Sequence, residues 1–189
     1  MNKLISFNKI DNAIVVQSGI LLTEIHNICE KNNMLFPLSL ASEGSCTIGG
    51  NIATNAGGIG VLYYGNTREL TLGLEIVLAD GSIINLLKTL KKDNTGYSLK
   101  DLFIGSEGTL GVITAASLKI FPKPHEKFTF LASVKSPKKS LDFLRKIQKN
   151  ISTPLTSFEI MNHNSLNIVL ENIQNTHLPI PVKEKWYIL

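Results

Sequence analysis

The chain has 189 residues, of which 43% are hydrophobic and 18% charged, so it can bury the core of one domain or slightly more. The net charge of +4 comes from scattered lysines rather than from a basic run, which argues against a nucleic-acid-binding protein. The sequence contains no run of about 18 successive apolar residues, so it predicts no transmembrane segment.

The cysteines, the histidines and the first residues carry little sign of special chemistry. Residues 1–11 lack the apolar core of a secretory signal peptide, so we expect a cytoplasmic location. Cys29 and Cys46 belong to no CxxC motif, and we expect reduced, partly buried thiols, with Cys46 used in packing. The four histidines are isolated from one another, so we expect no metal site.

The chain begins with a predicted strand, a helix and a short extended segment. Residues 13–16 are an apolar run that ends in a Ser-Gly turn, as a strand does. Residues 21–32 carry apolar side chains at helical spacing. Residues 35–38 contain Pro37, and proline disfavours helix at the residue before it.

Residues 44–65 hold seven of the 14 glycines in the chain. An ordinary helix or strand would lose stability at this glycine density, so we expect unusual backbone dihedrals or a close approach to another group. Ser, Thr and Asn flank the glycine pairs, and together they expose hydroxyls and backbone N–H groups. Such a surface can hold a phosphate-bearing ligand or the polar edge of a ring, and it can equally be a tight structural turn. The spacing matches neither the Rossmann nor the P-loop motif.

Strands dominate the next stretch of the chain. Two are predicted at residues 72–78 and 82–87, joined by an Asp-Gly turn that tolerates positive φ. A helical turn is expected at residues 99–103, before a strand at 112–120. The Pro-x-Pro stretch that follows is the candidate domain boundary.

Beyond this boundary the sequence alternates between strands and helices. Strands are predicted at residues 127–134, 154–160 and 186–189, with helices after Ser136-Pro137 and over residues 164–173. This alternation predicts a compact α+β unit. The expected domains are therefore residues 1–123 and 124–189, and the expected fold class of the chain is α+β.

Five motifs, in a fixed order, resemble one protein family. They are Ser45–Gly58, Tyr64–Arg68, Gly73–Gly81, Asp93–Tyr97 and Leu102–Thr114. They resemble the FAD-linked oxidases with a vanillyl-alcohol-oxidase-type (PCMH-type) FAD-binding domain, especially the D-2-hydroxyglutarate, D-lactate and glycolate dehydrogenase group. The resemblance implies FAD as cofactor and a small 2-hydroxy acid as substrate. It also implies the second half of a FAD-binding domain, followed by the start of an α+β cap domain.

The resemblance further implies which residues contact the flavin. The expected cofactor-binding positions are Ser45, Thr47, Ile48, Gly49, Gly50, Asn51, Thr54, Val112 and Ile113. For Ser106 and Glu107, a turn that orients the following strand and a contact with the ligand remain equal alternatives.

The sequence also departs from the family pattern. Members commonly carry Asn, Arg and Asp where this chain has Gly60, Tyr63 and Ser98, and each replacement removes a polar or charged side chain. The family has a glycine-rich pyrophosphate loop before the position that matches Ile14, and a His-x-His region towards its C-terminus. We expect neither in this chain, so we assign no catalytic residue. We also expect that the chain by itself does not retain FAD.

Three functional hypotheses therefore remain open. The chain is an enzyme fragment that separately encoded parts complete, a non-catalytic remnant, or an interaction module without bound flavin. A half-domain leaves apolar surface and sheet edges unpaired, so a remnant would be poorly folded, whereas an interaction module would use the exposed half-site as a partner surface. Whether the chain is an enzyme is left undecided by the sequence.

Overall fold

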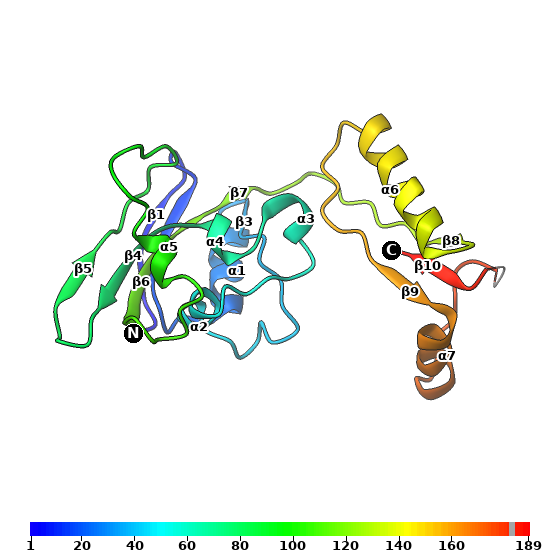
Figure 1. Ribbon diagram of the computed structural model, residues 1–189, viewed down its shortest axis with the longest axis horizontal. Coiled ribbons are helices and arrows are strands. Elements are labelled where there is room, and N and C mark those ends of the chain that lie inside the picture. Colours follow the sequence, from blue (N-terminus) through cyan, green and yellow to red (C-terminus); the bar gives the residue numbers. More distant parts are fainter. Residues whose placement is uncertain (182–183) are drawn as a thin grey trace. The chain divides into compact units, whose positions relative to one another are not determined.

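The computed structural model describes residues 1–181 and 184–189, which form two compact units, Met1–His125 and Glu126–Leu189 (Figure 1). Both units combine helices with antiparallel sheets, so the predicted α+β class is confirmed. In the described residues, no helix combines the length and the apolar composition needed to cross a bilayer.

A five-stranded antiparallel sheet organises the first unit. Its strands are β1 (Leu4–Asn8), β2 (Ala13–Gln17), β4 (Thr71–Val77), β5 (Ile83–Asn85) and β6 (Val112–Lys119). Their spatial order is β1-β2-β6-β4-β5, so β6 lies at the centre although it comes last in the chain. The expected strands at residues 13–16, 72–78 and 112–120 are all present.

Five helices accompany this sheet, and Figure 1 shows α1, α2 and α4 on one side of it. The helices are α1 (Leu22–Lys31), α2 (Ile48–Ala53), α3 (Val61–Tyr64), α4 (Thr67–Leu70) and α5 (Lys100–Phe103). A two-stranded sheet, β3 (Met34–Leu35) with β7 (Phe121–Pro122), joins the exit of α1 to the end of β6. The apolar spacing predicted α1 correctly, because Leu22, Ile25 and Cys29 are buried on one face.

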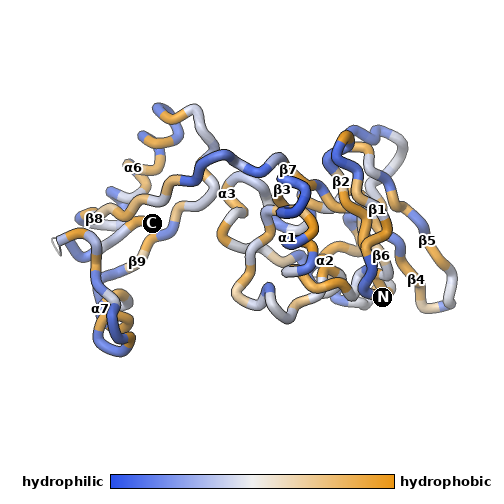
Figure 2. Tube along the Cα trace, turned by 180° about the vertical axis from the view of Figure 1, so that it is seen from behind, coloured by the Kyte–Doolittle hydropathy of each residue, from blue (hydrophilic) through white to orange (hydrophobic). Residues whose placement is uncertain are grey.

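The hydrophobic core of the first unit lies between the sheet and these helices. Four of the five residues of β2 are buried, which explains why the strand reads as an apolar run without alternation. The orange stretches along β1 and β2 in Figure 2 mark their hydrophobic residues. Ile14, Ile25, Ile48 and Leu118 are fully buried in this core.

The glycine-rich segment differs in part from its expected conformation. Of its seven glycines, all of them described by the structure, only Gly65 has a positive φ, of 78°. Gly49 and Gly50 lie inside α2, so the expectation of unusual dihedrals is wrong for them. The expected close approach does occur, because a Cβ at Gly58 would lie 1.8 Å from the Ser39 carbonyl oxygen and one at Gly49 would lie 2.6 Å from the Ser18 Cβ.

The second unit contains a three-stranded antiparallel sheet and two helices. Its elements are β8 (Ala132–Val134), α6 (Pro137–Asn150), β9 (Ile160–Asn162), α7 (His163–Asn172) and β10 (Trp186–Ile188), with strand order β8-β10-β9. The strands expected at residues 127–134 and 154–160 are wrong over most of their length. The physical reason is that the shared partner, β10, has only three residues and pairs with three residues of each neighbour.

Candidate functional site

Backbone hydrogen bonds hold the glycine-rich segment against the loop between β2 and α1. The amide of Gly49 donates to the Ser18 carbonyl at 2.7 Å, and the amide of Ile48 donates to the Ile20 carbonyl at 3.0 Å. In return, the amide of Leu22 donates to the Cys46 carbonyl at 3.1 Å. These bonds fix the first turn of α2, a helix that its two glycines would otherwise weaken.

Ser18 connects this segment to the central strand of the sheet. Its amide donates to the Thr114 carbonyl of β6 at 2.9 Å, while its carbonyl accepts the bond from Gly49. Ser18 therefore brings residues 45–54 close to the start of β6, where the other two predicted positions lie. Ser18 was not among the predicted site residues. The Ser-Gly turn after the predicted strand is the sequence feature that marks its position.

Four of the predicted positions face outward on or beside α2. Thr47 caps the helix, with its Oγ1 accepting from the Gly50 amide at 3.4 Å. The Thr54 hydroxyl donates to the Gly50 carbonyl at 3.0 Å, and the Ser45 hydroxyl donates to the Ser42 carbonyl at 3.3 Å. Ser45, Gly50 and Thr54 are exposed and Thr47 is half-buried, so together they form the outer surface of α2.

The other predicted positions divide between packing and exposure. The Ile48 side chain is fully buried, and the buried Asn51 donates from Nδ2 to the Cys46 Sγ at 3.5 Å. Gly49 is packed against Ser18. At the start of β6, Val112 is exposed and Ile113 is buried. A ligand on the outer surface of α2 would therefore reach Ile48 and Asn51 through their backbone rather than their side chains.

This outer surface suits the edge of a flavin. Among the described residues, and apart from the chain neighbours of Gly50 and the helix backbone itself, a Cβ built on Gly50 would have only the Thr47 Oγ1 within 4 Å, at 3.5 Å, so the missing side chain leaves open space above the helix. A planar ring with polar edges needs such a close approach, with hydroxyl and backbone groups around it to fix its orientation. Ser45, Thr47 and Thr54 supply the hydroxyls, and the residues present fit FAD.

A turn after α5 closes the other end of α2. The Gly105 amide donates to the Ile52 carbonyl at 3.1 Å, and the Glu107 amide donates to the Ala53 carbonyl at 3.0 Å. Gly105, Glu107 and Gly108 all have positive φ, between 52° and 83°. The turn at residues 105–107 therefore donates to the carbonyls of the last two residues of α2, of which the Ile52 carbonyl also accepts from the Asn55 amide.

The thiols and the possible metal ligands show no reactive arrangement. Both cysteines are free, and burial raises the pKa of the Cys29 thiol to about 11, which disfavours the nucleophilic thiolate. Cys46 is half-buried and packs against the core. Among residues 1–181 and 184–189, no three His, Cys, Asp or Glu side chains are grouped so that they could hold a metal ion.

The chain is similar to several known proteins. A family of FAD binding domains matches residues 1–87. The mitochondrial D-2-hydroxyglutarate dehydrogenase of Rattus norvegicus is 43% identical over 190 residues, which is 100% of this chain and 35% of that protein. The corresponding protein of Arabidopsis thaliana is 38% identical over 189 residues, covering 100% of this chain and 34% of that one.

A solved structure of alkyldihydroxyacetonephosphate synthase has a TM-score of 0.73 and 24% identity over 89% of this chain and 30% of that one. This likeness shows a shared fold. The chain spans about a third of the length of the curated relatives it matches.

These findings correct one expectation and confirm two others. The rat and Arabidopsis relatives are named mitochondrial, so the expected cytoplasmic location is wrong. The composition of residues 1–11 does not bear on import into an organelle. The match to a family of FAD binding domains confirms FAD as the cofactor, and together with the relatives it confirms the resemblance to the FAD-linked oxidases. Residues 1–87 therefore match the family of FAD binding domains, and the chain as a whole is similar to about one third of the D-2-hydroxyglutarate dehydrogenases of rat and Arabidopsis.

Proposed function

We propose that this chain supplies the flavin-lining part of a FAD-dependent dehydrogenase that oxidises a D-2-hydroxy acid of the 2-hydroxyglutarate, lactate or glycolate type. The observation that carries the proposal is the outer surface of α2, where the open space at Gly50 lies between the hydroxyls of Thr47 and Thr54. The names of the rat and Arabidopsis relatives support the substrate class. Bound FAD would accept the hydride from the α-carbon of the hydroxy acid.

Each predicted residue has a part in this proposal. Ser45, Thr47 and Thr54 orient the flavin through their hydroxyls, and Gly50 allows the ring to approach the helix backbone. The remaining positions act through their backbone or by holding α2 in place. They are Ile48, Gly49, Asn51, Val112 and Ile113. The half-buried Cys46 packs beside Asn51 and takes no part in the chemistry.

A chimera tests the proposal directly. The matching third of the rat D-2-hydroxyglutarate dehydrogenase is replaced by this chain, and the product is purified by gel filtration. We expect a stoichiometric flavin spectrum and reduction of a redox dye that depends on D-2-hydroxyglutarate. A folded chimera without flavin would refute the proposal and favour an interaction module that binds no cofactor.

Variants of the chimera locate the site. Gly50→Val should lose flavin and dye reduction together, because its side chain fills the space above α2. Gly44→Val is the matched control, since a Cβ at this exposed glycine meets no atom within 4 Å, and it should keep both. Cys46→Ser should change little. Full flavin occupancy in Gly50→Val, together with loss of turnover in Cys46→Ser, would refute this site and indicate that the Cys46 thiol takes part in the reaction.

A further inference from the structure

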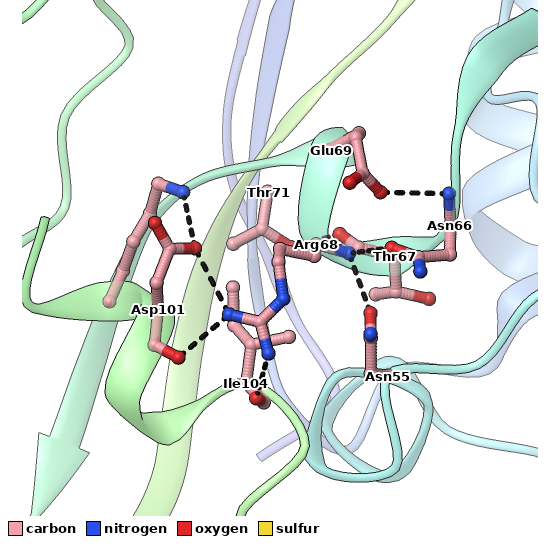
Figure 3. A network of polar contacts seen from close by, with 9 residues as sticks. Asn55, Asn66, Thr67, Arg68, Glu69, Thr71, Asp101 and Ile104 are labelled. Carbon is pink, nitrogen blue, oxygen red and sulfur yellow. Dashed lines mark hydrogen bonds and ion pairs between the residues drawn. The ribbon is translucent and has the colours of Figure 1, made fainter.

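Arg68 lies where three short segments of the first unit meet (Figure 3). It belongs to α4, a helix of four residues between the glycine-rich segment and β4. Its backbone amide donates to the Oδ1 of Asn55, at 3.0 Å, and to the Oδ1 of Asn66, at 3.1 Å. Asn55 follows directly on α2 and its C-cap Thr54, so the start of α4 is tied to the end of α2.

The guanidinium of Arg68 reaches the other side of this junction. Nη1 donates to the Asp101 carbonyl at 2.7 Å, and Nη2 donates to the Ile104 carbonyl at 2.6 Å. Asp101 is the second residue of α5, and Ile104 directly follows its last residue as the C-cap. A helix of four residues is unstable by itself, and its last carbonyls lack intrahelical partners. Arg68 supplies those partners and so holds α5 in place.

The turn that follows α5 then contacts α2. The amides of Gly105 and Glu107 donate to the carbonyls of Ile52 and Ala53, at 3.1 and 3.0 Å. Gly105 lies beside the guanidinium, since a Cβ built on it would be 3.6 Å from the Arg68 Nη2, an ordinary van der Waals contact distance. The contacts therefore form a closed ring from α2 to α4, through Arg68 to α5, and through the turn back to α2.

The shape of the guanidinium matters more here than its charge. Nη1 also lies 3.3 Å from the Asp101 Oδ1, which accepts a further bond from the Lys100 Nζ at 3.0 Å. Burial alone would raise the pKa of Asp101, but hydrogen bonds from the Ser98 and Lys100 side chains and the nearby charges lower it. The Arg68 and Asp101 side chains are 34% and 38% exposed, so the ion pair itself contributes little. The planar fork reaches the two carbonyls with two separate nitrogens in a fixed geometry, whereas a lysine ammonium would have to reach both from one nitrogen.

We propose that Arg68 is a positioning residue that fixes the turn at residues 104–108 against the C-terminal end of α2. By holding this end of the helix, Arg68 also holds the outer surface that carries Gly50 and Thr54. The effect on the flavin rests on the proposed function, whereas the anchoring of the turn does not.

Amide hydrogen exchange on the isolated chain tests the anchoring without flavin. Arg68→Lys keeps the positive charge and loses the fork. Exchange at Gly105 and Glu107 should become at least about tenfold faster, since each lost hydrogen bond to a charged group corresponds to roughly that factor. Exchange in β6 should stay unchanged, because the hydrogen-bond partners of Arg68, which are Asn55, Asn66, Asp101 and Ile104, lie outside this strand. Unchanged exchange at Gly105 and Glu107, or equal acceleration in β6, would overturn the proposal.

Two control variants separate geometry from charge. Arg145→Lys makes the same chemical change on an exposed face of α6 and should leave Gly105 and Glu107 unaffected. Lys100→Ala removes the second cation at Asp101 but keeps both carbonyl bonds of Arg68, and the exchange of the turn should again be preserved. If Lys100→Ala accelerated amide exchange at Gly105 and Glu107 as strongly as Arg68→Lys does, charge rather than the fork would hold the turn.

The chimera described above tests the consequence for the flavin. Arg68→Lys should release flavin several-fold faster on dilution, whereas Lys100→Ala should release it at the original rate. Unchanged release in Arg68→Lys, in a chimera that loses flavin on Gly50→Val, would overturn the link to the flavin surface. A chimera in which no variant binds flavin would instead refute the proposed function, and the exchange experiment would still decide the anchoring.

Discussion

Gly49 and Gly50 are adjacent, yet different neighbours surround them in α2. A Cβ at Gly49 would lie 2.6 Å from the Ser18 Cβ and 3.0 Å from the Ser18 carbonyl oxygen. A Cβ at Gly50 would meet only the Thr47 Oγ1, at an ordinary contact distance of 3.5 Å. The first glycine therefore serves the packing of the helix, and the second leaves its outer surface open.

Alanine substitutions should separate these two roles. Gly49→Ala should lower the free energy of unfolding by about 1–3 kcal/mol, because the methyl group overlaps Ser18. Gly50→Ala should raise it by about 0.5–1 kcal/mol, because alanine is the better helix former at an exposed position. Urea denaturation of the isolated chain measures both values. Equal effects of the two substitutions would contradict the assignment of the faces.

The residue types of the site were predictable, but the direction of each side chain was not. The glycines, hydroxyls and amides of residues 45–54 indicated a surface for a ring or a phosphate. The sequence could not show that Ile48 and Asn51 are buried while Thr47 and Thr54 face outward, because α2 was not predicted. A six-residue helix with two glycines has low intrinsic propensity, and it forms here because the Ser18–Leu22 loop binds its first turn.

Among whole elements, length and periodicity decided what the sequence could predict. Helix α1 and the strands β2, β4 and β6 bury a continuous or regularly spaced apolar face, and their boundaries were placed within about two residues. The helices α3 and α4 have four residues each and no periodic pattern. Such helices depend on capping and on tertiary contacts, so the sequence gives little signal for them.

The two helices of the second unit offer a test of local capping. The Asn162 Oδ1 accepts from the Ser165 amide at 2.8 Å, and the Ser136 Oγ accepts from the Lys139 amide at 3.3 Å. Asn162→Ala and Ser136→Ala should each lower stability by about 1 kcal/mol, with the larger loss at the shorter bond. Thermal unfolding followed by far-UV circular dichroism measures the loss. Ser165→Ala keeps the backbone donor and serves as the control, and a loss there equal to that of Asn162→Ala would argue against the cap.

Over the whole molecule, the two units differ in how much they bury. The first unit has a continuous core, whereas the buried residues in the described part of the second are Ser140, Tyr187 and Ile188. In the second unit, Phe128 and Phe130 are 72% and 76% exposed. The hydrophobic effect scales with the apolar area removed from water, so it stabilises the second unit less.

Limited proteolysis should reveal this difference. Residues 122–130 are all exposed, and within this segment trypsin should cut first after Lys127. Lys123 should resist because Pro124 follows it and because its side chain pairs with Glu30. Mass spectrometry should then find a persistent product that ends at Lys127, while the rest is degraded. Early cleavage in the helices and strands of the first unit, outside its exposed segment at residues 91–99, would contradict the expected order of stability.

The central position of β6 has a consequence for folding during synthesis on the ribosome. Its neighbours β2 and β4 are complete by Gln17 and Val77, but neither can bond to β6 until residues 112–119 have been synthesised. Until then the nascent chain holds two separate hairpins, β1–β2 and β4–β5, each with an open edge. Before β6 is synthesised, the edges of β2 and β4 that will face it are open to wrong pairing. Because β6 pairs with both strands, its arrival covers these two edges at once.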